Sequence, residues 1–170
     1  MEDKYRVAII TLSDKGFEGK REDLSGPAIE EYLDQSAFFV TDRKILPDDR
    51  QMIEKELIRL CDEAKVDLIL TTGGTGFSMR DVTPEATMAV AHRNAPGIAE
   101  AIRALSLKVT KRAMLSRAVS VIRGKTLIIN LPGSPKAVRE CMEFIMDTIV
   151  HGMDILTGRD RECGGGYAHR

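Results

Sequence analysis

The sequence lacks tryptophan altogether, and its 170 residues include only three cysteines, three histidines and no long apolar run. Cys61, Cys141 and Cys163 are odd in number and widely spaced, which suits neither a disulfide framework nor a Cys-x-x-Cys metal or redox site. The first apolar run, residues 7–12, is too short for a signal sequence or a membrane span. We therefore expect a cytoplasmic protein without a membrane segment.

Neither sign of charge is in large excess: 25 basic residues face 26 acidic ones, a net charge of −1. This balance argues against a nucleic-acid partner. The distribution is uneven, however, because residues 101–139 contain no acidic residue. The nine basic residues there are Arg103, Lys108, Lys111, Arg112, Arg117, Arg123, Lys125, Lys136 and Arg139. Such a run usually marks solvated helix faces, but it also suits a small polyanion, which the motifs below favour.

Short apolar runs alternate with helical patterns along the whole chain. The patterns predict strands at residues 5–12, 37–46, 66–72, 119–123 and 126–131. They predict helices at residues 27–33, 51–64, 97–108 and 134–156, and a further helix that begins at Thr83. Ser25 is the expected N-cap of the first helix, and Thr83 is the expected cap of the helix that begins there. Residues 66–70 and 126–130 are almost continuously apolar, as in parallel strands covered on both faces. We predict one domain over residues 1–170, an α/β three-layer sandwich with a mostly parallel sheet and a flexible tail from about residue 160.

Ligands of such sheets bind outside the carboxyl ends of the strands, so the loops after strands are the candidate sites. Residues 71–76, T-T-G-G-T-G, follow the third predicted strand. Glycines allow positive φ and let backbone N–H groups approach an anion closely. The loop matches neither G-x-x-x-x-G-K-[ST] nor G-x-G-x-x-G. By itself it fits a tight turn as well as a phosphate site.

Two acidic residues follow the second and third predicted strands. Asp81 lies between the glycine loop and the next helix, and Asp48 follows the second strand. If these strands end on the same edge, the two carboxylates would form a site for Mg²⁺. The alternatives are that Asp81 only favours the helix dipole and that Asp48 or Asp49 caps the following helix. We expect Asp49 to be the cap, which leaves Asp48 free.

Polar residues follow the other strands as well. Ser13 and Asp14 come after the first strand, and residues 130–136, N-L-P-G-S-P-K, come after the fifth. A helix start at Ser134 places Lys136 in the first turn, where a positive charge is unfavourable unless an anion is bound. The sequence shows no Ser-His-Asp or Cys-His order that would indicate a protein nucleophile, and the histidines are too far apart for a zinc pattern.

The ordered set of motifs at residues 11–14, 23–27, 71–76, 80–87, 115–117 and 130–136 resembles the MogA family of molybdopterin adenylyltransferases. The resemblance extends from about residue 6 to residue 156. It implies a molybdopterin-binding α/β sandwich that assembles as a homotrimer. It also implies the transfer of AMP from ATP to the phosphate of molybdopterin, with Mg²⁺ as cofactor, release of pyrophosphate, and a molybdenum insertase as the downstream partner.

The same resemblance implies roles for individual residues. Asp48 and Asp81 would be catalytic and hold the metal. The nucleotide would be bound by Ser13, Asp14, Gly73, Gly74, Thr75 and Gly76. The remaining substrate-binding residues would be Ser116, Arg117, Pro132, Gly133, Ser134 and Lys136. Two other interpretations stay open: a non-catalytic molybdopterin-binding or scaffold module of the same fold, and a flavin carrier, which the scarcity of aromatic residues disfavours.

Overall fold

A six-stranded sheet with the order β2-β1-β3-β6-β5-β4 forms the centre of the molecule. The computed structural model describes residues 4–159, so the predicted tail lies outside the described residues. The strands are β1 (Tyr5–Leu12), β2 (Phe38–Leu46), β3 (Leu68–Thr72), β4 (Arg93–Asn94), β5 (Ser120–Arg123) and β6 (Thr126–Leu131). β2, β1, β3 and β6 run parallel, and β5 and β4 complete the sheet in antiparallel pairing.

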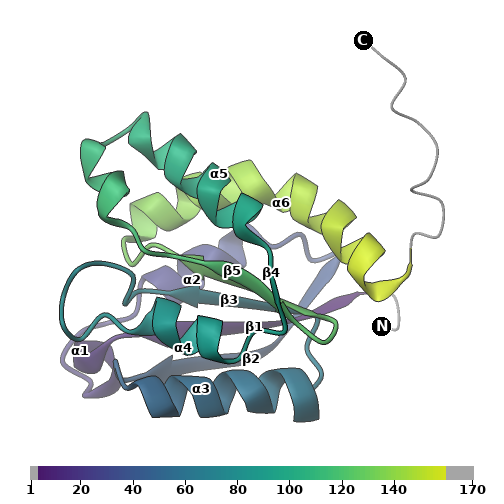
Figure 1. The fold of residues 1–170 in the computed structure, drawn as a ribbon, viewed down its shortest axis with the longest axis horizontal. Coiled ribbons are helices and arrows are strands. Elements are labelled where there is room, and N and C mark those ends of the chain that lie inside the picture. Colours follow the sequence, from purple (N-terminus) through teal and green to yellow (C-terminus); the bar gives the residue numbers. More distant parts are fainter. Residues whose placement is uncertain (1–3, 160–170) are drawn as a thin grey trace.

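Helices cover both faces of the sheet (Figure 1). They are α1 (Asp14–Phe17), α2 (Ser25–Glu31), α3 (Arg50–Ile58), α4 (Thr83–Ala89), α5 (Pro96–Leu107) and α6 (Pro135–Thr157), with a π-helical turn, η1 (Arg59–Glu63), and a 3₁₀ turn, η2 (Lys111–Leu115). α2, α5 and α6 lie on one face, and α3 and α4 on the other. The α/β sandwich with a mostly parallel sheet is therefore confirmed. None of the helices within residues 4–159 combines the length and apolar character that a membrane crossing needs.

The two helical layers explain why the central strands are apolar at almost every position. In β1, Val7 and Ile9 are buried against α2 and α6, whereas Ala8 and Ile10 are buried against α3 and α4. Successive side chains of a strand point to opposite faces, so a strand covered on both sides has no position for water-facing residues.

The helix starts test the predicted caps. Asp49 accepts a hydrogen bond from the Met52 N–H (2.9 Å), so this expected cap is confirmed. Ser134 accepts one from the Ala137 N–H, so the predicted helix start is confirmed and Ser134 is its cap. The predicted cap at Ser25 is wrong. Asp23 holds the first turn of α2 instead, and Ser25 is the first helical residue. Likewise α4 begins at Thr83 itself, with no side-chain cap. Aspartate is as good a cap as serine, and the sequence pattern did not distinguish them.

A β-bulge in β2 determines which side chains of this strand face α3. Val7 pairs with Val40, but Ala8 pairs with Asp42, so Thr41 is an extra residue. Its hydroxyl donates to the Val7 carbonyl (3.3 Å). Paired residues of parallel strands point to the same face of the sheet, and Ala8 points toward α3. The bulge therefore turns Asp42, and every second residue after it, toward α3. The buried Leu46, two residues before Asp48, belongs to that set.

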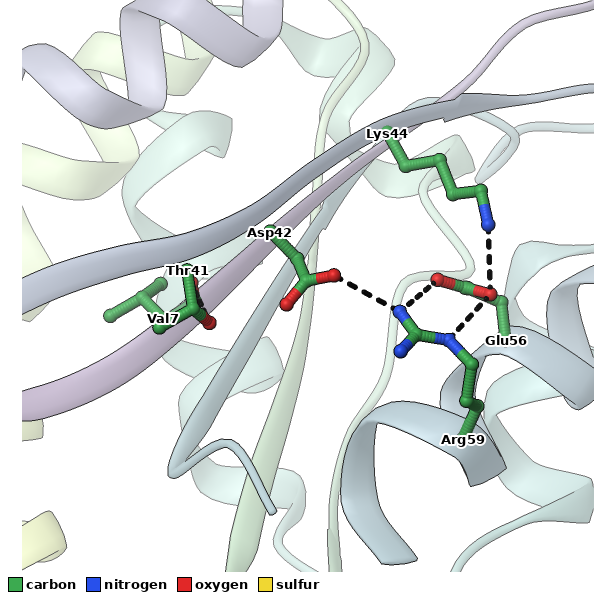
Figure 2. A network of polar contacts seen from close by, with 6 residues as sticks. All are labelled: Val7, Thr41, Asp42, Lys44, Glu56 and Arg59. Atoms are coloured by element: carbon green, nitrogen blue, oxygen red, sulfur yellow. Dashed lines mark hydrogen bonds and ion pairs between the residues drawn. The ribbon is translucent and has the colours of Figure 1, made fainter. Parts of the chain in front are cut away.

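An ion-pair network fixes α3 on this strand (Figure 2). Arg59 donates to both carboxylate oxygens of the buried Glu56 and to Asp42 (3.0 Å), and Lys44 donates to Glu56 (3.1 Å). Hydrogen bonds from Arg59 and Lys44 hold the pKa of Glu56 below its ordinary value. The network therefore joins the end of α3 to β2. These are the two elements that the connection with Asp48 links.

We predict that Glu56→Gln lowers the free energy of unfolding at pH 7 by about 1–2 kcal/mol, because Arg59 and Lys44 lose a buried anionic partner. Since the folded-state pKa of Glu56 is lowered, its stabilisation is present above the ordinary pKa of 4.5 and is lost as the pH falls through the folded value. Urea unfolding at pH 7 and at acidic pH measures both effects. Glu54→Gln, which removes a surface partner of Arg50, is the control; an equal loss in both variants contradicts the prediction.

Candidate active site

The carboxyl ends of the four parallel strands meet at one edge of the sheet. Residues Leu12 and Leu46 are paired at the ends of β1 and β2, and Thr72 of β3 pairs with both Thr11 and Leu131. The loops that follow these strands therefore emerge side by side. In Figure 1 this edge is on the side of α1 and of the long loop between β3 and α4.

A cavity of about 590 Å³ lies at this edge, a volume typical of small-molecule sites. The predicted site residues that line it are Ser13, Asp48, Gly73, Gly74, Asp81 and Gly133. Its other lining residues are Thr11, Leu12, Gly16, Arg21, Glu22, Asp23, Leu24, Ser25, Thr72 and Pro135. Residues from five separate loops or strand ends thus share one cavity.

The glycine loop passes too close to its neighbours for side chains. Gly73 and Gly74 have φ of +94° and +66°. A Cβ on Gly73 would lie 2.4 Å from the Leu12 carbonyl oxygen, and one on Gly74 would lie 2.3 Å from Thr83 Oγ1. The Thr83 hydroxyl donates to the Gly73 carbonyl (3.0 Å). Glycine is therefore required both by the left-handed backbone and by the close approach of β1 and α4.

The carboxylates of Asp48 and Asp81 both lie close to the glycines of this loop. A Cβ on Gly74 would lie 3.0 Å from Asp48 Oδ1, and one on Gly76 would lie 2.9 Å from Asp81 Oδ2. Asp81 Oδ2 also accepts from the Ser78 N–H (3.0 Å). Burial, with the nearby charges of Asp14 and Asp81, raises the pKa of the Asp48 carboxyl above its ordinary value. The carboxylates predicted from separate loops therefore face one cavity and repel each other.

Asp14 is joined to Asp48 by reciprocal bonds. The Asp14 N–H donates to Asp48 Oδ2 (3.1 Å), and the Asp48 N–H donates to Asp14 Oδ1 (2.9 Å). Arg80 donates to both Asp14 oxygens, from Nε (3.0 Å) and Nη2 (2.8 Å). These bonds from Arg80 hold the pKa of Asp14 below its ordinary value. Asp14, predicted as a nucleotide contact, thus directs its carboxylate to Arg80 and is not part of the cavity lining.

The cavity lining is acidic. Glu22, Asp23, Asp48 and Asp81 contribute four carboxylates, against the single guanidinium of Arg21. No group of three or more metal-ligating side chains occurs within residues 4–159. The Asp48 and Asp81 pair still fits a divalent cation, because carboxylates are the ligands that Mg²⁺ prefers and a cation would relieve their repulsion. A polyphosphate needs such a cation to approach these acids.

A second cavity, of about 270 Å³, lies on the other side of the glycine loop. The predicted residues that line it are Thr75, Gly76, Ser116 and Pro132. The remainder of its wall comes from α5, η2 and α6, with Ile102 and Leu115 among its apolar residues. The glycine loop therefore separates a cavity with acidic side chains, bordered by Gly73 and Gly74, from a more apolar one.

Arg117 holds the glycine loop in place. Its guanidinium donates to the carbonyls of Gly76 (2.7 Å) and Asp81 (2.6 Å) and pairs with Glu85, while its own N–H donates to the Thr75 carbonyl (2.8 Å). Its predicted role as a substrate contact stays a prediction. Its contacts in the structure fasten the loop between β3 and α4.

Residues 101–139, the basic segment of the sequence, are less available to an anion than their composition suggests. Arg103 donates to the Ala118 carbonyl (2.6 Å), and Arg123 and Arg139 pair with Asp62 and Glu31. Lys136 is exposed and lies 3.9 Å from Glu140. Neither Lys136 nor Ser134, which caps α6, lines the larger cavity. Acidic residues outside the segment thus neutralise part of its charge.

Sequence reasoning overlooked three residues of this edge: Arg21, Asp23 and Ser25 line the cavity. Ser25 donates to the Gly133 carbonyl (2.7 Å), and Asp23 accepts from Thr11 (2.8 Å). The D-L-S-G-P motif at residues 23–27 was the sequence feature that could have pointed to Asp23 and Ser25. A capping motif, however, does not indicate which strand end its loop will reach.

Comparisons with known proteins agree on the chain as a whole. Residues 8–151 match the family described as probable molybdopterin binding domain. A molybdopterin adenylyltransferase of Helicobacter pylori strain J99 is 45% identical, with 89% of this chain and 88% of the relative covered. That of Escherichia coli K12 is 43% identical, with 87% and 79% covered. The molybdopterin biosynthesis enzyme MoaB of Thermus thermophilus superposes with a TM-score of 0.86 at 47% identity, covering 91% of this chain and 97% of the other.

We predict that Asp48→Asn raises the melting temperature by about 2 °C at pH 7.5 without divalent cations, because it removes a half-buried charge that Asp14 and Asp81 repel. Added Mg²⁺ at ten times its dissociation constant should raise the wild-type melting temperature by about 3 °C and leave the variant unchanged. Calorimetry with and without Mg²⁺ measures both. A lower melting temperature in the variant, or an equal response to Mg²⁺, contradicts the prediction.

Proposed function

Since this chain belongs to the molybdopterin-binding domain family, we propose that it is a molybdopterin adenylyltransferase, which transfers AMP from ATP to the phosphate of molybdopterin. The observation that carries this proposal is the approach of Asp48 and Asp81 to one glycine loop, between two cavities. The products are adenylyl-molybdopterin and pyrophosphate. A molybdenum insertase receives the adenylated pterin.

The transfer needs no protein nucleophile. The terminal phosphate oxygen of molybdopterin attacks the α-phosphorus of ATP, and the bond from that phosphorus to the bridging oxygen of pyrophosphate breaks. Hydroxyls beside the loop have structural partners, since Thr83 donates to the Gly73 carbonyl (3.0 Å) and Ser25 donates to the Gly133 carbonyl (2.7 Å). Catalysis on this site therefore rests on positioning and on stabilising the charge of the leaving group.

Different residues of the chain would position the substrates and stabilise the charge of the leaving group. We assign phosphate binding to the loop at Gly73 and Gly74, because their left-handed backbone is of the kind in which backbone N–H groups form anion sites. Asp48 and Asp81 are the residues that would hold Mg²⁺. When bound, the ion would neutralise phosphate charge that the acidic cavity would otherwise repel. Arg117 keeps the loop between Gly76 and Asp81 in its conformation.

The two cavities give the two substrates separate places with a common border. Their volumes, about 590 and 270 Å³, suit a nucleotide and part of a pterin. Ser116 and Pro132 border the second cavity. We assign the reaction to the cytoplasm, which is supported by the buried, unpaired cysteines Cys61 and Cys141 of the described chain.

We predict that Asp48→Ala and Asp81→Ala each lower the rate of pyrophosphate release from ATP and molybdopterin by at least about 10²-fold, because each removes a carboxylate from the proposed cation site. Detection of adenylated pterin together with pyrophosphate measures the reaction. Asp49→Ala is the matched control: it removes the neighbouring carboxylate, which caps α3, and should cost about 1 kcal/mol of stability while the rate is retained.

Wild-type protein that binds molybdopterin but releases no pyrophosphate in this assay contradicts the enzyme proposal, provided that a known active adenylyltransferase works in parallel. That result would favour the binding or scaffold module. Unchanged rates in both aspartate variants of an active enzyme would contradict the roles given to Asp48 and Asp81.

We also propose that the chain forms a homotrimer. Four apolar residues are exposed in the stretch that runs from the end of α5 through η2: Leu107, Val109, Met114 and Leu115. Clustered exposed apolar residues are a feature of association surfaces. We predict a mass of three chains by light scattering at micromolar concentration, and a shift toward the monomer for Met114→Glu. Met52→Glu, on the exposed side of α3, is the control. A monomeric wild-type protein contradicts the prediction.

A further inference from the structure

We propose that Arg80 is a positioning residue of this site, whose ion pair with Asp14 neutralises a third carboxylate beside Asp48 and ties the loop that carries Asp81 to the end of β1. The inference rests on the proposed function for its meaning in catalysis. Its effect on cation binding is independent of the reaction.

The contacts form one continuous chain between the two proposed metal-holding residues. Arg80 is the chain neighbour of Asp81, and its guanidinium grips both oxygens of Asp14. Asp14 and Asp48 in turn exchange backbone-to-carboxylate hydrogen bonds. Planar, bidentate pairing with a carboxylate fixes direction as well as distance. The position of Asp81 relative to Asp48 is thus linked through Arg80 and Asp14.

The charges lead to the same assignment. Without Arg80, the carboxylates of Asp14, Asp48 and Asp81 would place three negative charges near one loop. With Arg80 paired to Asp14, two of these three charges remain uncompensated, those of Asp48 and Asp81, and a pair of carboxylates matches a divalent cation. An additional free carboxylate would attract the cation more strongly and would repel the triphosphate that the cation has to meet.

A role in folding alone does not account for Arg80. Its side chain is 61% exposed, and ion pairs of exposed side chains contribute little to the stability of a fold. The neighbouring residues Phe77 and Met79 are also exposed, so Arg80 does not anchor an apolar cluster. The bond to Asp14 therefore acts on the loop and on the charge of the site.

The test uses the full chain without nucleotide and Mn²⁺ as the probe, with binding followed by electron paramagnetic resonance. Arg80→Gln should bind Mn²⁺ roughly three- to tenfold more tightly than wild type, because the Asp14 charge is no longer compensated. The double variant Arg80→Gln/Asp14→Asn should return to within about twofold of wild type, since the amide side chain still offers an oxygen to the Asp48 N–H. Arg80→Lys should also stay near wild type, because it keeps the positive charge.

Steady-state kinetics of adenylyl transfer separates charge from geometry. In Arg80→Gln, kcat/KM for ATP should fall by roughly tenfold or more. In Arg80→Lys, KM should remain near the wild-type value while kcat falls, since lysine keeps the charge but not the bidentate grip. Arg50→Gln is the control, because it removes a nearby surface charge that pairs with Glu54. It should leave Mn²⁺ affinity and kcat/KM within about twofold.

Mn²⁺ affinity that is unchanged or weaker in Arg80→Gln overturns the proposal, as does equal tightening in Arg50→Gln. Unchanged kcat in both Arg80 variants of an active enzyme overturns the positioning role. If the wild-type protein transfers no AMP while the Mn²⁺ series follows the expected order, the proposed reaction is wrong and the charge assignment of Arg80 stands.

Discussion

The repulsion between carboxylates at the ends of neighbouring parallel strands is the constraint on which this site depends. Asp14, Asp48 and Asp81 are brought together because β1, β2 and β3 end at one edge. Backbone N–H groups and Arg80 stabilise part of that charge. The remainder, on a half-buried Asp48, is tolerated by the fold because packing on both faces of the sheet supports the strands. These carboxylates are in this sense a destabilising part of an otherwise well-packed molecule.

The surrounding structure keeps those strand ends in register. The bulge at Thr41 determines which side chains of β2 face α3, and the Glu56 network fixes α3 against the same strand. Asp48 lies between the two, in a connection of only a few residues. Arg117 fixes the glycine loop in a similar way, although it lies more than thirty residues further along the chain. The candidate site residues therefore lie in loops, and contacts remote in sequence determine the positions of those loops.

Local rules were sufficient to predict much of this architecture. The apolar runs of β1 and β6, the cap at Asp49 and the helix start at Ser134 depend on neighbouring residues alone, and each was found where the pattern indicated. The sequence also indicated that Asp48 and Asp81 would share an edge, since parallel topology places strand ends together. It could not indicate that Asp14 would turn to Arg80, or that acids from outside the basic segment would pair with Arg123 and Arg139, because those contacts exist only after folding.

The contacts of Tyr5 have a further consequence. Its hydroxyl bonds Asp154 near the end of α6, and the Arg159 guanidinium lies 4.1 Å from the centre of its ring. The first strand and the last helix of the described chain are thus joined at the edge where the strands begin, opposite the site (Figure 1). This contact fastens α6 to β1 at the start of the strand and leaves the opposite strand ends, where the larger cavity lies, free of it.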